Sequence, residues 1–405
     1  MLSRILYGLG LMLALTAADT PAANAWRDGL TRQDVVAALG EPEGDLSSGN
    51  SERMVFKGGL LIVVTNNKVT SIEGTVPDSL KASAVSSSTA TPETTTTSPA
   101  AKEYVTSGLA KESNGDHDGA MADYTKAIEL APAEAIPYFD RGVVEEGKGD
   151  RAAAMADFNK AIELNPKFIQ AYNDRGNAKA VQRDYDGAIA DYSKAIELNP
   201  QVALPYYNRA HALGNKGDYS RAITDYSKTI ELAPDNADAY FNRANVEEAK
   251  SDHDHALADL TKAIELQPGA ADAYSNRGNV KYHKGDADGA IADYTKAIAL
   301  DPKRVSAFSG RGHARAAKND FDGAIADFST VIQLQPANAQ AFSDRGSVKA
   351  MKDDLPGSLA DYDAAIKLDP KLAIAYTNRA LTKQKMGDTA GAAEDRATAA
   401  KLTGK

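Results

Sequence analysis

Arginine and aspartate recur through most of the chain at a fixed interval of 34 residues. The arginines are Arg141, Arg175, Arg209, Arg243, Arg277, Arg311, Arg345 and Arg379, and the aspartates are Asp123, Asp157, Asp191, Asp225, Asp259, Asp293, Asp327, Asp361 and Asp395. A planar guanidinium can bind a carboxylate through two parallel hydrogen bonds, so the pattern predicts structural ion pairs. Ser107 stands where a first arginine would be, and nothing equivalent precedes it. We therefore expect each arginine to pair with the aspartate of the preceding repeat; pairing within one repeat is the alternative.

Carboxamide and aromatic residues form a second recurring set, close in sequence to the arginines. Its members are Asn177, Tyr207, Asn208, Phe241, Asn242, Asn245, Asn276, Asn279 and Asn378. A carboxamide both donates and accepts hydrogen bonds, so a row of them can bind the backbone of an extended peptide. Aromatic neighbours would add buried anchors. The alternative is a polar face that only contacts water.

Residues for other chemistry are sparse. The chain has no cysteine, which excludes disulfides, thiolate zinc sites and cysteine nucleophiles. His253, Asp254 and His255 fall in one turn with no further ligand evident, so we predict no metal site and no cofactor. Paired acidic residues such as Asp286 and Asp288 recur without a glutamate twelve residues into the loop, so we expect them to cap helices rather than bind calcium.

Regularly spaced prolines, here called the proline ladder, indicate the helices that position these residues. Prolines stand every 34 residues, at 132, 166, 200, 234, 268, 302, 336 and 370. Such a period indicates a solenoid, here of nine units of 34 residues over 101–405, the last of them one residue short. In each unit a first helix (A) carries an aromatic at position 4 and a small residue at position 8. Glycine is frequent at position 15, and a second helix (B) carries alanine at 20, an aromatic at 24 and alanine at 27.

This pattern resembles the tetratricopeptide repeat. The resemblance implies a mainly α fold: a right-handed superhelix of antiparallel helix pairs, with helix A lining a concave groove. Leu260, Ser358 and Arg396 depart from the pattern. The asparagine row resembles the asparagine ladder of O-linked N-acetylglucosamine transferase repeats. The family's clamp for chaperone tails needs a lysine at position 5, and no unit has one.

The chain preceding the repeats has three predicted parts. Residues 1–25 are typical of a secretory signal peptide cut after Ala25, which predicts a periplasmic or secreted protein. In residues 26–76, the run from Gly29 to Pro42 predicts a short helix over 31–39, and strands are predicted over 53–57, 60–65 and 68–73. This helix motif and the Asn-Lys-Val-Thr-Ser-Ile strand resemble the BamE-like outer-membrane assembly module, which implies a small α+β unit. Residues 77–100, rich in Ser, Thr and Pro, are expected to be a flexible tether; O-glycosylated residues are the alternative.

Composition limits the function classes. Alanine supplies 73 of 405 residues, which favours thin, closely packed helical layers. The net charge of −10 argues against nucleic-acid binding, and no segment after the signal is apolar enough to span a membrane. We expect an interaction module that binds a protein or peptide in its groove. An envelope scaffold using both modules is the alternative, and an enzyme is a remote one because residues 26–76 contain no catalytic motif. The sequence identifies neither the partner nor the oligomeric state.

Overall fold

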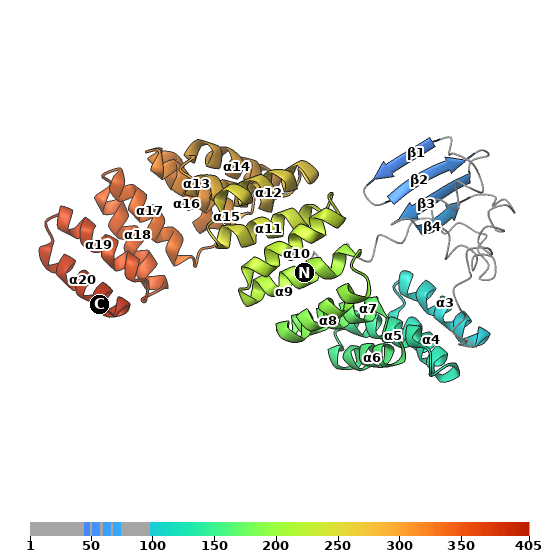
Figure 1. Cartoon of the computed structure of the whole chain (residues 1–405). Helices are drawn as coiled ribbons and strands as arrows, with labels where there is room; N and C mark the ends of the chain where they lie inside the picture. The colour runs from blue at the N-terminus through green and yellow to red at the C-terminus, as the bar shows by residue number, and fades with distance from the viewer. Residues whose placement is uncertain (1–43, 49–50, 57–59, 66–67, 74–97, 405) are drawn as a thin grey trace. The chain divides into compact units, whose positions relative to one another are not determined.

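The computed structural model describes residues 98–404 and four strand segments, 44–48, 51–56, 60–65 and 68–73. Within residues 98–404, eighteen helices alternate as the A and B helices of nine repeats (Figure 1). The A helices are α3 (Pro99–Ser113), α5 (Ala135–Lys148), α7 (Ile169–Val181), α9 (Ala203–Lys216), α11 (Ala237–Ala249), α13 (Ala271–His283), α15 (Val305–Ala317), α17 (Ala339–Met351) and α19 (Ala373–Lys385). The B helices are α4 (His117–Leu130), α6 (Arg151–Leu164), α8 (Tyr185–Leu198), α10 (Tyr219–Leu232), α12 (His253–Leu266), α14 (Ala287–Leu300), α16 (Phe321–Leu334), α18 (Leu355–Leu368) and α20 (Thr389–Thr403). The helical solenoid expected from the sequence is therefore confirmed.

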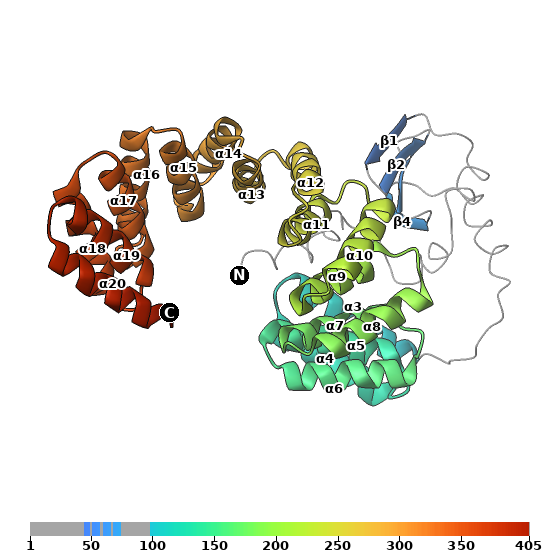
Figure 2. The same ribbon diagram turned by 60° about the vertical axis from the view of Figure 1, so that its left-hand side comes forward.

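The chain divides into two compact units, whose boundary runs through α9 and α10. Within each unit, a B helix packs on the A helix of its own repeat and on that of the next repeat, as for α17 to α20 in Figure 2. Consecutive A helices also pack on each other, at α5–α7 in the first unit and at α11–α13, α13–α15 and α17–α19 in the second. The A helices therefore form the inner layer of each unit and carry the face on which position 6 and position 9 lie.

Alanine and aromatic side chains of the B helices make the core. In repeat 3, Ala188 and Ala195 are fully buried and Tyr192 is 2% exposed. A glycine at position 8 of helix A accommodates the ring: a Cβ on Gly176 would lie 2.6 Å from a ring carbon of Tyr192. The alanine richness of the chain thus reflects positions where two helices touch.

The turn between helix A and helix B has left-handed backbone at position 15 in all nine repeats. Five repeats have glycine there, with φ between +78° and +89°. The others use Arg183, Ser251, Asn319 and Asp353, with φ between +61° and +67°. Position 16 then caps helix B: Asp184, for example, accepts a hydrogen bond from the Gly187 backbone N–H at 2.9 Å.

Four antiparallel strands form one sheet in the order β1-β2-β3-β4. They are β1 (Gly44–Ser48), β2 (Ser51–Phe56), β3 (Leu60–Thr65) and β4 (Lys68–Glu73). The sequence indicated the last three and missed β1. The predicted signal peptide, the helix over 31–39 and nearly all of the predicted tether lie outside the described residues. No helix in the described part is both long and apolar enough to cross a bilayer.

Candidate functional site

In repeats 2, 3 and 5–9 the recurring arginine and aspartate pair within one repeat, which corrects the expectation of pairs between repeats. Arg175 donates from Nε and Nη2 to the two oxygens of Asp191, at 2.9 and 2.6 Å. The same two-bond geometry joins Arg141–Asp157, Arg243–Asp259, Arg277–Asp293, Arg311–Asp327, Arg345–Asp361 and Arg379–Asp395. The helices of a repeat are antiparallel about position 15, so positions 7 and 23 lie level with each other.

The arginine does reach the preceding repeat, but through another atom and to another residue. Its Nη1 donates to position 25 of the preceding helix B, as from Arg243 to the Ser227 hydroxyl at 2.8 Å and from Arg209 to Ser193 at 2.9 Å. The guanidinium also lies over the ring at position 4, with Arg175 5.5 Å from the Tyr172 centroid. Arginines such as Arg243 thus hold together the two helices of their own repeat and also contact helix B of the preceding repeat.

Position 11 determines how well the buried aspartate is neutralised. In repeat 3, Lys179 adds a second cation to Asp191 at 2.7 Å. In repeat 5 this position is Glu247, which is 5% exposed, lies near Asp259, and has an Oε2 that accepts no hydrogen bond within the described residues. Burial, followed by repulsion from Asp259, raises the pKa of Glu247 to about 7. Glu145 occupies the same position in repeat 2, with its pKa raised to about 7 for the same reasons.

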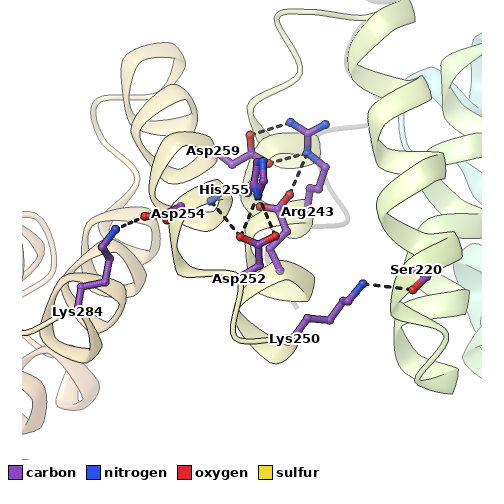
Figure 3. A network of polar contacts seen from close by, with 9 residues as sticks. Ser220, Arg243, Lys250, Asp252, Asp254, His255, Asp259 and Lys284 are labelled. Atoms are coloured by element: carbon purple, nitrogen blue, oxygen red, sulfur yellow. Dashed lines mark hydrogen bonds and ion pairs between the residues drawn. The ribbon is translucent and has the colours of Figure 1, made fainter.

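One recurring set of ion pairs between repeats connects a lysine at position 14 to an aspartate at position 18 of the preceding repeat. They join Lys148 to Asp118, Lys284 to Asp254, Lys318 to Asp288 and Lys352 to Asp322. Figure 3 shows Lys284, which directly follows α13, beside Asp254 of α12, while His255 faces Asp252. Only the aspartates at position 16, such as Asp286, cap helix B, whereas those at position 18, such as Asp288, bridge repeats, which corrects the expectation that both would be helix caps.

Most of the predicted groove asparagines form hydrogen bonds with other polar side chains, chiefly asparagines and tyrosines. Asn177 and Asn279 accept hydrogen bonds from the hydroxyls of Tyr192 and Tyr294, at 2.8 and 2.7 Å. Other carboxamides donate across a repeat junction: Asn208 to Asn173, Asn276 to Asn245 and Asn378 to Ser347. Tyr207 and Asn242 are half-buried. Phe241 packs against the apolar core of its unit.

Repeats 2 and 3 carry aspartate instead of asparagine at position 6. Burial, and then the charge of Glu112, raises the pKa of Asp140 to about 7. Asp174 accepts hydrogen bonds from Asn173 and Asn177, at 3.0 and 3.3 Å. The row is interrupted at Gly310, where a Cβ would lie 2.5 Å from the Tyr294 ring.

A cavity of about 120 Å³ opens at the junction of repeats 5 and 6. Its lining residues are Ala244, Asn245, Glu248, Leu260, Asn276, Asn279 and Val280. Leu260 stands where repeats 3 and 6 have a tyrosine that hydrogen-bonds to the asparagine at position 9. The smaller side chain leaves Asn245 without a phenol beneath it. Three of the predicted groove residues, Asn245, Asn276 and Asn279, thus line one cavity. Asn177 and Asn378 lie in other repeats.

Two histidines and a glutamate meet beside this cavity. Nδ1 of His253 lies 2.8 Å from Oε2 of Glu248, and Nδ1 of His283 lies 2.7 Å from Oε1 of Glu248. Burial by itself raises the pKa of Glu248, but the hydrogen bonds from the two rings outweigh it and lower the pKa. The sequence indicated only His253. Its partner His283 stands thirty residues further on, the same separation that joins Lys284 to Asp254.

Comparison with known families and structures agrees with these helical repeats. Models described as tetratricopeptide repeat match residues 102–134, 135–168, 169–202, 192–224, 237–269, 271–304 and 310–373, and one described as TPR repeat matches 215–251. These matches cover more than half of the chain, which therefore belongs to the tetratricopeptide repeat family. The family fold is that of a protein–protein interaction module, and no enzyme family is among the matches.

Several solved structures are similar to part of this chain. The crystal structure of YrrB, described as a TPR protein with an unusual peptide-binding site, is 28% identical and covers 48% of this chain and 97% of its own, with a TM-score of 0.42. MamA is 27% identical, covering 42% and 94%, with a TM-score of 0.40. A TPR protein from Cytophaga hutchinsonii is 17% identical, covering 58% and 97%, with a TM-score of 0.50. Comparison with curated proteins returned no significant match.

Proposed function

We propose that this chain is an exported, non-catalytic module that binds an extended peptide segment on the inner face of its A helices. The cavity between repeats 5 and 6 is the anchor site. Its apolar lining from Ala244, Leu260 and Val280 suits one aliphatic or aromatic side chain of the partner. The polar residues at its edge suit the backbone on either side of that anchor.

The hydrogen bond between Asn276 and Asn245 carries this proposal. It uses the Nδ2 of Asn276 and the Oδ1 of Asn245, at 2.8 Å. Within the described residues, Asn245 Nδ2 donates to nothing and Asn276 Oδ1 accepts nothing. One donor and one acceptor therefore remain side by side, complementary to the C=O and N–H of a peptide backbone. A carboxamide held by its neighbour binds with less loss of rotamer freedom.

The export part of this proposal is supported by the signal-like sequence of residues 1–25. The sequence pattern of a short helix followed by strands supports a small α+β, BamE-like module over 26–76. In the alternative function, an envelope scaffold, both the repeats and this module hold partners across the tether at 77–100. The four-stranded sheet favours this alternative, because it is a separate element that the groove does not need.

Peptide selection tests the groove. A display library of random peptides would be selected on the full chain, and the recovered peptides titrated by fluorescence anisotropy. Asn276→Ala should weaken binding at least tenfold, because it removes the carboxamide pair. Asn378→Ala, the same change at the same repeat position away from the cavity, should leave the affinity within twofold.

A second variant tests the cavity itself. The pair Ala244→Gly and Leu260→Tyr recreates the glycine and tyrosine of repeats 3 and 6, so the ring should fill the cavity and abolish binding. Equal affinity of all variants would refute the groove site. Peptides retained by a chain deleted of 101–405 would instead support the scaffold.

A further inference from the structure

Three metal-ligating side chains converge from three helices at the junction of repeats 5 and 6. Glu248 lies near the end of α11, His253 begins α12 and His283 ends α13. The ligand atoms, one from each side chain (an imidazole nitrogen of each histidine and a carboxylate oxygen of Glu248), all lie within 4.8 Å of one another. In the described part of the chain, no other group of three histidine or acidic side chains has this geometry.

We propose that Glu248, His253 and His283 bind a divalent first-row transition ion such as Zn²⁺. Two imidazoles and one carboxylate are a ligand set that zinc uses in proteins, with bonds of about 2.0–2.2 Å. Tetrahedral bonds of that length separate ligand atoms by about 3.4 Å. The two Glu248–His contacts, 2.8 and 2.7 Å and each to a different carboxylate oxygen, need to lengthen by about 0.6–0.7 Å to reach this separation. Each ring then carries its proton on Nε2.

The surroundings favour ion entry and hold the ligands in place. The side chains of Glu248, His253 and His283 are 26%, 32% and 53% exposed, so the ion reaches the site from solvent. The pair between Lys284 and Asp254 connects residues adjacent to both histidines (Figure 3).

His255 does not belong to the ligand set. Its Nδ1 faces Asp252 at 2.8 Å, and its side chain is 74% exposed. The motif of histidines flanking Asp254 thus contributes one ligand, and the next repeat supplies another.

Three protein ligands leave one tetrahedral position open. Glu248 also lines the cavity of about 120 Å³, so the ion lies at its edge. The ion would bridge the repeat 5 helices α11 and α12 to α13 of repeat 6. Because the ligands come together only in the folded solenoid, binding must stabilise that junction. Metal binding here does not depend on peptide binding in the cavity.

Calorimetric titration with ZnCl₂ tests the site. The full chain, without a histidine tag and stripped with EDTA, should bind one Zn²⁺ per molecule with a dissociation constant in the micromolar range or below. His253→Gln, His283→Gln and Glu248→Gln should each weaken binding at least tenfold. His255→Gln is the matched control and should bind as the wild type does. Bound Co²⁺ should show the intense visible absorption of a four-coordinate site.

Thermal unfolding followed by circular dichroism separates ligand loss from misfolding. Without metal, all variants should unfold within a few degrees of the wild type, since the changes lie at partly exposed helix ends. With Zn²⁺, only the wild type and His255→Gln should show a raised midpoint. The proposal is overturned if the wild type takes up no Zn²⁺. It is equally overturned if the three ligand variants bind as the wild type does.

Discussion

Arg243 and Asp259 form a two-bond ion pair inside one repeat, with Nε–Oδ2 and Nη2–Oδ1 distances of 2.6 and 2.8 Å. The third nitrogen of the same guanidinium reaches Ser227 of the preceding repeat. Asp259 is 6% exposed. The pair therefore orients two helices of one repeat and their neighbour at once, in an environment where an unpaired charge is costly.

Repeat 6 offers a direct test of these pairs, because Asp293 there holds both Arg277 and Lys281, each at 2.8 Å. Asp293→Ala leaves two cations without their carboxylate and should destabilise this region by about 3–5 kcal/mol. Arg277→Met leaves Asp293 paired with Lys281 and should cost clearly less. Urea denaturation, with hydrogen exchange of α13 and α14 amides to localise the effect, measures both. Equal losses would contradict the shared-anion arrangement.

Glu247 should make stability depend on pH. Its folded pKa of about 7 exceeds the ordinary value of 4.5, so the folded state binds more protons between these values. Stability should therefore fall as the pH rises from 4.5 to 7 and remain low above it. Glu247→Lys recreates the lysine found at this position in repeats 3 and 6, and should raise stability at pH 8 by about 1–2 kcal/mol after allowance for solvent screening.

The pH dependence of the gain provides the control for this prediction. At pH 5 the glutamate is already protonated in the folded state, so Glu247→Lys should gain less there. Glu265→Lys, on the exposed face of α12, should change the thermal midpoint little at either pH. A gain at pH 5 as large as that at pH 8 would contradict repulsion by the buried acid.

Helix positions and the core could be predicted from the sequence because they depend on periodicity. The proline ladder sets the register, and the small and aromatic positions of helix B repeat with it, so Ala188 and Tyr192 are buried as their spacing indicates. The partner of each arginine could not be predicted in this way. Arg209 has an aspartate at a comparable distance in sequence on either side, and only the antiparallel packing about position 15 decides between them.

The missed site features depend on contacts between repeats. His283 joins His253 only through the register that places position 13 beside position 17 of the preceding repeat. The lysine–aspartate pairs follow the same register, so their recurrence was a usable signal. Leu260 was recognisable as a departure from the pattern. Its consequence, a cavity under Asn245, depends on how the neighbouring side chains fill space, and one sequence does not contain that information.

The same glycine-to-alanine change should have opposite effects at two positions. A Cβ on Gly278 would lie 2.8 Å from the Tyr294 ring, so Gly278→Ala should destabilise by about 1–3 kcal/mol through overpacking. A Cβ on Gly147, near the end of α5, would meet nothing within 4 Å. Gly147→Ala should stabilise by up to about 1 kcal/mol through helix propensity. Thermal midpoints of the two variants give the signs, and a loss at both positions would exclude ring contact as the cause at Gly278.

Filling the cavity should raise stability while it removes binding. In the pair Ala244→Gly and Leu260→Tyr, the tyrosine ring occupies apolar space between repeats 5 and 6, and its hydroxyl reaches Asn245 as that of Tyr294 reaches Asn279. We expect a gain of about 1 kcal/mol, less than a closed cavity would give because this one is open to solvent. The single change Leu260→Tyr, which keeps the alanine methyl against the ring, should gain less than the pair. Chemical denaturation of the three chains measures the order, and a stability loss in the pair would show that Leu260 serves packing rather than a vacant binding site.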